Sequence, residues 1–230
     1  MVAGTLSKAG YFMGNRLLPP NDDNPKGYFE DYEINAINED ILGPLVPKRI
    51  SVFGQEYFRH RPLQWQRWVA CLPLDIKIRC SPEIAQRMQR VTFRDPYCFK
   101  DPRFCYTLPA WRPYLKGAAF VVVFREPAKT AVSILKACQH APIRLTFRQA
   151  LKVWTQMYKH ILEIHHYDGD WLFLHYSQLL TDQGLNKLES FLQTLVDRSF
   201  PDALLSRSFS SEPIPRDTER VYESLCELVR

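Results

Sequence analysis

Two side chains spaced eight residues apart could together bind an anion. In the stretch "FREPAKTAVSIL", Arg125 follows an apolar run, and Ser133 falls within the helix that Pro127 is expected to begin. Helical side chains lean toward the N-terminus of their helix, so the serine hydroxyl can face back toward the arginine. A guanidinium, a hydroxyl and the positive end of a helix dipole together suit a phosphate group. A surface arginine followed by a serine on a solvated helix face is the alternative interpretation.

A lysine in "FKDPR" could supply a second cation. Lys100 stands at the end of a possible strand and is followed by an Asp-Pro turn, which would hold its ammonium group over the sheet edge. An ammonium group in that position could stabilise charge on a phosphate or sulfate bridge. The alternative is a salt bridge within the turn, with Asp101 or Asp95 as the partner.

Two neighbouring carboxylates, Glu30 and Asp31, end the stretch "NPKGYFED" and precede an apolar helix. Acidic side chains in the first turn of a helix are favoured by the helix dipole, so capping explains both of them. A carboxylate that is partly buried beside Tyr28 and Phe29 could also act as a general base. The residues alone leave both interpretations open.

Strands and helices alternate along the part of the chain that carries these side chains. The strongest strand prediction is residues 118–124, "AAFVVVF", whose two apolar faces suit a strand inside a parallel sheet. Further strands are predicted at residues 97–100 and 171–176, with a long helix over 146–166 that opens with a T-x-x-Q capping box. The order predicts an α/β sheet of mainly parallel strands with helices on both faces. Ligands of such sheets bind at the carboxyl ends of the strands, where both cations described above fall.

In this order, the stretches resemble motifs of the PAPS-dependent sulfotransferases. "FREPAKTAVSIL" is similar to the family's 3'-phosphate-binding motif, with arginine and serine at the family's spacing. "KDPR" before it, "WLFLHYSQLL" after it and "NPKGYFED" near the start match the order seen in bacterial members and, more loosely, in tyrosylprotein sulfotransferases. The resemblance extends from Met1 to about residue 196. It implies the three-layer α/β, P-loop NTPase-like fold of that family.

The resemblance implies a role for each candidate residue. Arg125 and Ser133 would bind the 3'-phosphate of PAPS, and Lys100 would stabilise charge near the transferring sulfuryl group. Glu30 would stand where tyrosylprotein sulfotransferases keep a carboxylate base, with Asp31 as the alternative. The implied reaction is in-line transfer of the sulfuryl group from PAPS to a hydroxyl of an unidentified acceptor, without a metal ion.

Two features depart from the family pattern. The family's first strand ends in a phosphate-binding loop that leads into a helix, and residues 1–11 are predicted to be that helix. Gly4 falls within this helix rather than in a loop, so we expect a single domain, residues 1–230, truncated at the N-terminus and lacking the first strand and loop. The glycine-rich R-K-G motif near the end of animal cytosolic members is also missing. Arg207 is a candidate for an additional contact to the 3'-phosphate, or an exposed residue of an irregular tail.

Other functions fit parts of the same sequence. The first alternative is a non-catalytic protein that retains only 3'-phosphate nucleotide binding. A P-loop kinase is a weaker alternative, because ATP carries a free 3'-hydroxyl and would leave the groups of a 3'-phosphate site without a phosphate to bind. The aromatic and basic stretch at residues 57–68 could stack on nucleic-acid bases, but we predict that it belongs to a lid or an acceptor-side helix.

The composition suits a globular domain in the cytoplasm. The 230 residues are 46% hydrophobic and 24% charged, which allows a sizeable core. The basic residues behind the net charge of +5 are scattered, which suits a nucleotide-like anion better than a nucleic acid. Six cysteines without a CxxC pair predict reduced thiols rather than a zinc knuckle or disulfides. No apolar run approaches the roughly 18 residues that a membrane helix needs.

Overall fold

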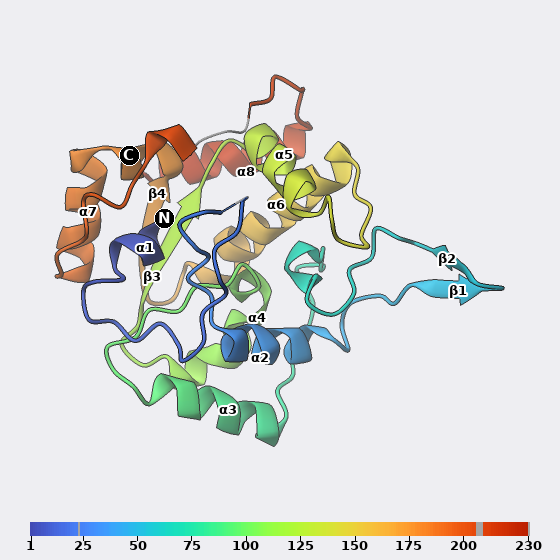
Figure 1. Cartoon of the computed structure of the whole chain (residues 1–230), viewed down its shortest axis with the longest axis horizontal. Helices are drawn as coiled ribbons and strands as arrows, with labels where there is room; N and C mark the ends of the chain where they lie inside the picture. Colours follow the sequence, from blue (N-terminus) through green and yellow to red (C-terminus); the bar gives the residue numbers. More distant parts are fainter. Residues whose placement is uncertain (23, 206–208, 230) are drawn as a thin grey trace.

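Two parallel strands lie at the centre of the structure, which is a computed structural model that describes residues 1–22, 24–205 and 209–229 (Figure 1). Strand β3 (Ala119–Phe124) pairs along its whole length with β4 (Asp170–His175). Both strands are confirmed to within one residue of the sequence prediction. Their pairing brings Phe124 opposite His175, so the carboxyl ends of the two strands lie side by side.

A long helical crossover connects the two parallel strands. It contains α5 (Pro127–Ala137) and α6 (Phe147–His160), and a π-helical turn over Ile161–His165 extends α6. Pro127 begins α5, where its missing N–H costs nothing. The predicted capping box is present at the start of α6, where Thr146 and the residue three positions later bond to each other's backbone. These predictions are confirmed.

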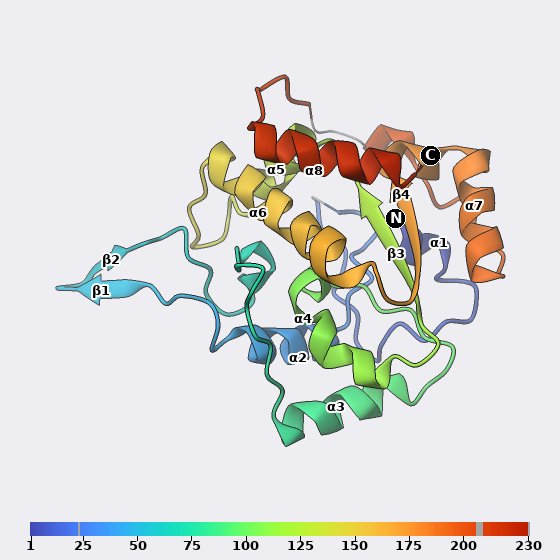
Figure 2. The ribbon, with the colours of Figure 1, turned by 180° about the vertical axis from the view of Figure 1, so that it is seen from behind.

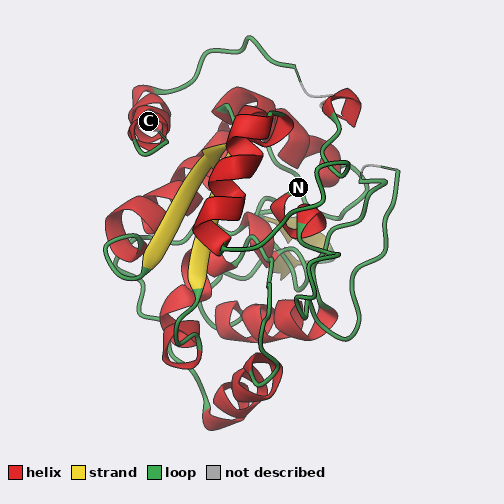
Figure 3. Ribbon diagram, turned by 90° about the vertical axis from the view of Figure 1, so that its left-hand side faces the viewer, coloured by secondary structure: helices red, strands yellow, loops and turns green. Residues whose placement is uncertain are grey.

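Helices cover both faces of the strands. Val122, Phe124 and Phe173 pack on one face against α6 and α8, which Figure 2 shows in front of the strands. On the opposite face, Leu174 packs against the α1 segment and α7, and Figure 3 shows the strands between the C-terminal helix on one side and the N-terminus on the other. The elements in these layers are α1 (Val2–Thr5), α7 (Asp182–Leu192) and α8 (Arg216–Glu227).

Three further helices form a separate hydrophobic cluster beside the amino ends of the strands (Figure 1). They are α2 (Tyr32–Leu42), α3 (Pro82–Thr92) and α4 (Phe104–Trp111). Ile37 of α2, Met88 of α3 and Trp111 of α4 are fully buried against one another. The helix predicted after Asp31 is therefore confirmed, and its apolar side supplies this core.

Residues 97–100 do not form the predicted strand. Tyr97 makes a single parallel bridge with Phe12, and Cys98 donates a backbone hydrogen bond of 2.9 Å to the same residue. The chain then turns at Asp101, so there is no length over which a ladder could continue. The parallel sheet has two strands in the described part of the chain, and Lys100 ends an extended segment beside it.

The first helix is also shorter than predicted. Residues 1–11 were expected to be helical, but α1 ends at Thr5 and is followed by turns. The hydroxyls of Thr5 and Ser7 each donate at 2.8 Å to a carbonyl oxygen three residues earlier. Such local bonds compete with the helical ladder and favour tight turns.

The aromatic and basic stretch at residues 57–68, predicted to belong to a lid or an acceptor-side helix, does not form a helix. Tyr57 ends a β-hairpin made of β1 (Ile50–Val52) and β2 (Gln55–Tyr57). A loop follows, and only Arg67–Val69 forms a 3-10 turn. The loop residues Phe58 and Trp65 have positive φ angles of 58° and 69°, which a helix does not allow.

Candidate functional site

Glu30 and Lys100 form an ion pair, although they are 70 residues apart in the chain. Lys100 donates from Nζ to one carboxylate oxygen of Glu30. The other oxygen accepts a hydrogen bond of 3.1 Å from Nδ2 of Asn35, on the first turn of α2. The Glu30 side chain is 8% exposed and that of Lys100 is 42% exposed. The pair therefore joins a buried carboxylate to an ammonium group that solvent and ligands can reach.

Asn35 adds an unsatisfied acceptor beside this pair. Its Oδ1 atom is buried and has no hydrogen-bond partner among the described residues. Buried acceptors are usually paired, so a donor from a bound molecule or a water would complete this one. Phe29, directly before Glu30, has a positive φ of 54°. Bulky residues rarely adopt this backbone conformation, and such strained positions cluster at functional sites.

Asp31 has a different role from its neighbour. Its Oδ1 atom accepts hydrogen bonds from the backbone N–H groups of Glu33 and Ile34 at 2.9 and 3.3 Å, so it caps α2. Its Oδ2 atom accepts from the backbone N–H of Arg16 at 2.8 Å. Both oxygens thus bind backbone donors in a buried position. Of the two candidate carboxylates, only Glu30 contacts the lysine.

The turn after Lys100 is held by a buried charge network. Asp101 does not pair with Lys100, as the alternative interpretation had it, but with Arg103, whose NH1 lies 2.9 Å from Oδ1. Arg103 also donates from Nε to Glu39 of α2 at 2.8 Å. Asn38 donates to the other oxygen of Asp101 at 2.9 Å. Burial raises the pKa of Asp101, an effect that Arg103 opposes and the nearby Glu30 charge reinforces.

This network was missed by sequence reasoning, although a signal for it exists. Asn38 and Glu39 lie on α2 among the isoleucines that face the core, and both are completely buried. Polar residues within the apolar stripe of a helix require partners, since burying an unpaired charge is costly. Arg67 provides a second partner for Glu39, with NH1 2.8 Å from Oε2. The network fixes the backbone that presents Lys100.

Arg125 lies at the carboxyl end of β3, where the sequence predicted it. Its guanidinium carbon is 5.2 Å from the centre of the Tyr176 ring, which follows β4. Its Nε is 3.9 Å from Oε2 of Glu126. The same carboxylate lies 3.7 Å from Nε2 of His175 and pairs with Lys129 on α5. The carboxylate of Glu126 thus lies among three cationic or titratable groups, two at the strand ends and one on α5.

The electrostatics of this cluster follow from partial burial. Burial lowers the pKa of His175, although the charge of Glu126 opposes the shift. Burial is the largest single influence on Glu126 and favours its neutral form, but the hydrogen bond from Lys129, a backbone hydrogen bond and the nearby positive charges together outweigh it and lower the pKa of this carboxyl. Glu126 is therefore ionised near neutral pH and neutralises part of the positive charge around Arg125.

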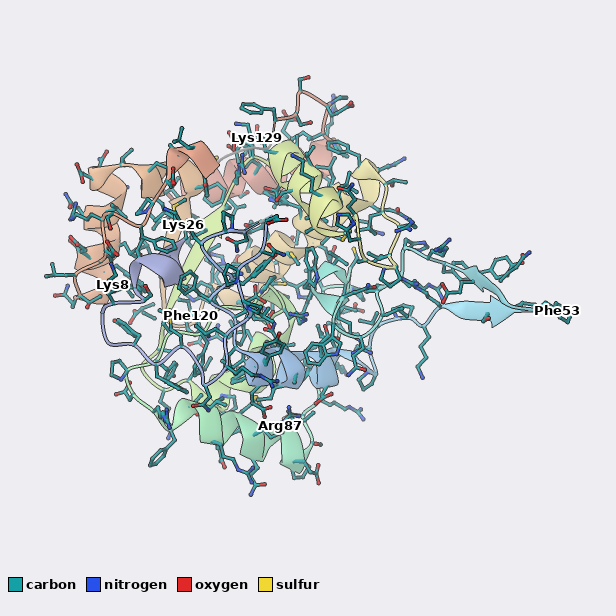
Figure 4. The ribbon with its side chains drawn as sticks, in the orientation of Figure 1. Lys8, Lys26, Phe53, Arg87, Phe120 and Lys129 are labelled. Carbon is teal, nitrogen blue, oxygen red and sulfur yellow. The ribbon has the colours of Figure 1, made fainter. Side chains whose placement is uncertain are left out.

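Ser133 is exposed on α5, and its hydroxyl has no hydrogen-bond partner in the part of the chain that the structure describes. It lies four residues after Lys129 and seven after Glu126, so all three occupy one side of the helix. Figure 4 shows Lys129 at the end of α5. Contact between Ser133 and Arg125 through a shared ligand stays a prediction. Arg207, the other candidate for the 3'-phosphate, lies outside the described residues.

A segment after α7 lies near both groups of candidate residues. The Phe200 ring packs on Gly4 and lies edge-on to Phe29 at 5.4 Å. Lys26 lies 3.5 Å from Asp202. The charge of Asp202 adds to burial in raising the pKa of Tyr176, the phenol under Arg125. Residues 197–202 therefore adjoin the Glu30 end and the Arg125 end of the candidate site.

Gly4 does not provide an open phosphate cradle. A side-chain carbon added at this position would lie 2.1 Å from ring atoms of Phe200. The backbone around it is tied to the same segment, since Asp197 donates to the carbonyl of Thr5 at 2.8 Å. The Phe200 ring occupies the space that a phosphate would need. Gly4 itself lies within α1, as predicted.

Comparisons with protein-family models, with curated proteins and with solved structures find no match for this chain. Within the described ranges, no cluster of three or more His, Cys, Asp or Glu side chains could hold a metal ion. No helix among the described residues has the length and apolar character needed to cross a bilayer. The six cysteines form no disulfide among the residues that the structure describes.

Proposed function

We propose that this protein transfers a sulfuryl group from PAPS to a hydroxyl of an acceptor, with the P-loop NTPase-like fold of the sulfotransferases. The contact between Glu30 and Lys100 carries the proposal. The resemblance assigns these two residues to the base and to the charge-stabilising cation of one reaction. Their contact across 70 residues of chain supports that assignment, because the base and the cation of one reaction must lie at the same reacting centre.

In the proposed mechanism, Glu30 and Lys100 act on opposite sides of the sulfuryl group. The donor phosphosulfate attracts the Lys100 ammonium group and so releases the Glu30 carboxylate. The acceptor oxygen then attacks sulfur, and its proton passes to Glu30. The bond between sulfur and the bridging oxygen breaks, and Lys100 stabilises the charge on the leaving phosphate. The products are a sulfate ester and adenosine 3',5'-bisphosphate.

The nucleotide end of the donor would bind at the carboxyl end of β3. Arg125 supplies a guanidinium for the 3'-phosphate, and the first turn of α5 supplies a favourable dipole. Ser133 would add a hydroxyl from the same side of α5. Residues 197–202, which adjoin both ends of the site, would lie along the donor.

A nucleotide-binding protein without transfer activity is the second candidate. The packing of Phe200 on Gly4 favours it, because this glycine offers no loop for the 5'-phosphosulfate. Bisphosphate binding is common to both candidates, and turnover of PAPS distinguishes them.

Calorimetry with adenosine 3',5'-bisphosphate and with ATP tests the binding step. We expect the bisphosphate to bind more tightly, and Arg125→Ala to weaken its binding by about 1.5–3 kcal/mol, the value of a hydrogen bond to a charged group. Arg90→Ala is the matched control, because Arg90 is an exposed arginine on α3. Equal or tighter ATP binding would refute the donor assignment.

Production of adenosine 3',5'-bisphosphate from PAPS, with water or an added alcohol as acceptor, tests the transfer step. Glu30→Gln is expected to lower the rate about 100-fold or more while bisphosphate binding is retained. Glu33→Gln, an exposed residue three positions later, is the control. Bisphosphate binding without any turnover in the unmodified protein would support the non-catalytic candidate instead.

A further inference from the structure

The β1–β2 hairpin projects from the body of the molecule and takes no part in the site described above. Figures 1 and 2 show it extending beyond the other elements, and Figure 4 shows Phe53 at its tip. The Phe53 side chain is fully exposed, at 103% of its reference area. A two-stranded hairpin alone is at best marginally stable in water. Its projection into solvent therefore points to a partner that covers it.

One face of the hairpin is apolar. Ile50 lies opposite Tyr57, and Val52 lies opposite Gln55, on the same side of the ribbon. Each of the three apolar side chains among them is exposed. The intervening pair, Ser51 and Glu56, places its polar side chains on the other face. The hairpin thus presents aliphatic and aromatic groups along one side and at its tip.

The turn at the tip holds its aromatic residue in an unfavourable conformation. Phe53 and Gly54 connect the strands with φ angles of 46° and 78°. Two consecutive left-handed residues define a type I′ turn, in which Asn or Gly is favoured at the first position. A bulky residue there is strained, and full exposure means that no packing within the described chain compensates for it. The phenylalanine is therefore better explained by an external contact than by folding.

Basic side chains surround the base of the hairpin. Between residues 48 and 61 there are four basic residues and one acidic residue, a net charge of +3. The acidic residue, Glu56, is already paired with Arg49 at 3.4 Å. Lys48 and Arg59 are exposed. An apolar tip beyond a ring of positive charge suits a partner with a negative surface and an apolar interior.

We propose that the hairpin docks this protein on an anionic lipid bilayer, with Phe53 inserted among the lipids and the basic residues at the headgroups. Insertion and charge would each contribute, since one weak signal alone rarely anchors a protein. A second copy of the chain fits less well, because it would bring two ribbons of charge +3 together. Nucleic acid also fits less well, because a partner that stacks on the rings of Phe53 and Tyr57 would still leave the aliphatic side chains of Ile50 and Val52 without an apolar surface to cover them.

Co-sedimentation with vesicles tests the proposal. The full chain should bind phosphatidylcholine vesicles that contain phosphatidylserine, and bind phosphatidylcholine alone much more weakly. Phe53→Asn is the decisive variant, because the resulting Asn-Gly pair favours the type I′ turn while the aromatic group is lost. We expect it to lower the vesicle affinity about thirtyfold. Phe93→Asn, at another exposed phenylalanine, which follows α3, should bind as the unmodified protein does.

The charge contribution is tested separately. Lys48→Gln and Arg59→Gln should each lower binding to the phosphatidylserine vesicles by about fivefold, and added salt should weaken binding further. Unchanged vesicle binding by Phe53→Asn would overturn the proposal. So would Phe53-dependent self-association in sedimentation velocity, or Phe53-dependent binding of a single-stranded oligonucleotide, in place of vesicle binding.

Discussion

Replacement of Arg103 by methionine is expected to destabilise the protein by about 3–5 kcal/mol, the usual cost of removing one partner from a buried ion pair. The arginine is 3% exposed, and its guanidinium contacts two carboxylates. Methionine keeps much of the side-chain volume, so the change removes charge and hydrogen bonds more than packing. Asp101 and Glu39 would remain buried with a partner missing.

The magnitude depends on burial rather than on the number of contacts. Arg87 also pairs with two carboxylates, Glu33 at 2.7 Å and Asp40 at 2.6 Å, but these side chains are 47% and 45% exposed. Water replaces such contacts easily, so Arg87→Met is expected to cost less than about 1 kcal/mol. The two arginines form a matched pair that differs in burial.

Urea unfolding followed by circular dichroism measures both variants at neutral pH. The midpoint of Arg103→Met should fall far more than that of Arg87→Met, with similar slopes. The difference in urea midpoint between Arg103→Met and the unmodified protein should narrow on acidification. Burial raises the pKa of Asp101, so acid protonates this carboxyl and removes the charge that the substitution leaves unpaired. Similar losses of stability in the two variants would refute the reasoning.

Three more outcomes are expected. Burial lowers the pKa of His165 to about 4, so this histidine binds a proton more readily in the unfolded chain than in the folded one. The free energy of unfolding should therefore be steady above pH 6.5 and fall by about 3 kcal/mol as the pH drops from 6.5 to 4, and a urea midpoint that stays constant over this range would contradict this. Gly184→Ala should cost about 1–3 kcal/mol, because its Cβ would lie 2.0 Å from the carbonyl oxygen of Gln178; an unchanged melting temperature would count against this close contact. Thr146→Ala should cost about 1 kcal/mol through loss of the α6 cap, which thermal melting can measure against the capped chain.

Local patterns were sufficient for the elements that depend on near neighbours. The β-branched run at 118–124 became β3, and the capping signals before α2 and α6 lie where the helices begin. Caps and apolar periodicity involve residues within a few positions of one another, so they can be recognised without the fold. The same reasoning failed at residues 97–100, because a strand also needs a partner backbone beside it, and among the described residues Phe12 alone supplies one.

In the candidate site too, local sequence predicted some features and the fold was needed for others. Sequence alone placed Arg125 after a buried strand and named Glu30, Asp31 and Lys100 as carriers of chemistry. It could not decide between the two carboxylates, because each follows the same turn and precedes the same helix. Tertiary structure gives the two carboxylates different surroundings, since one caps α2 and the other meets a lysine from a distant segment. Contacts between distant segments depend on how the helices pack, and no local pattern encodes that geometry.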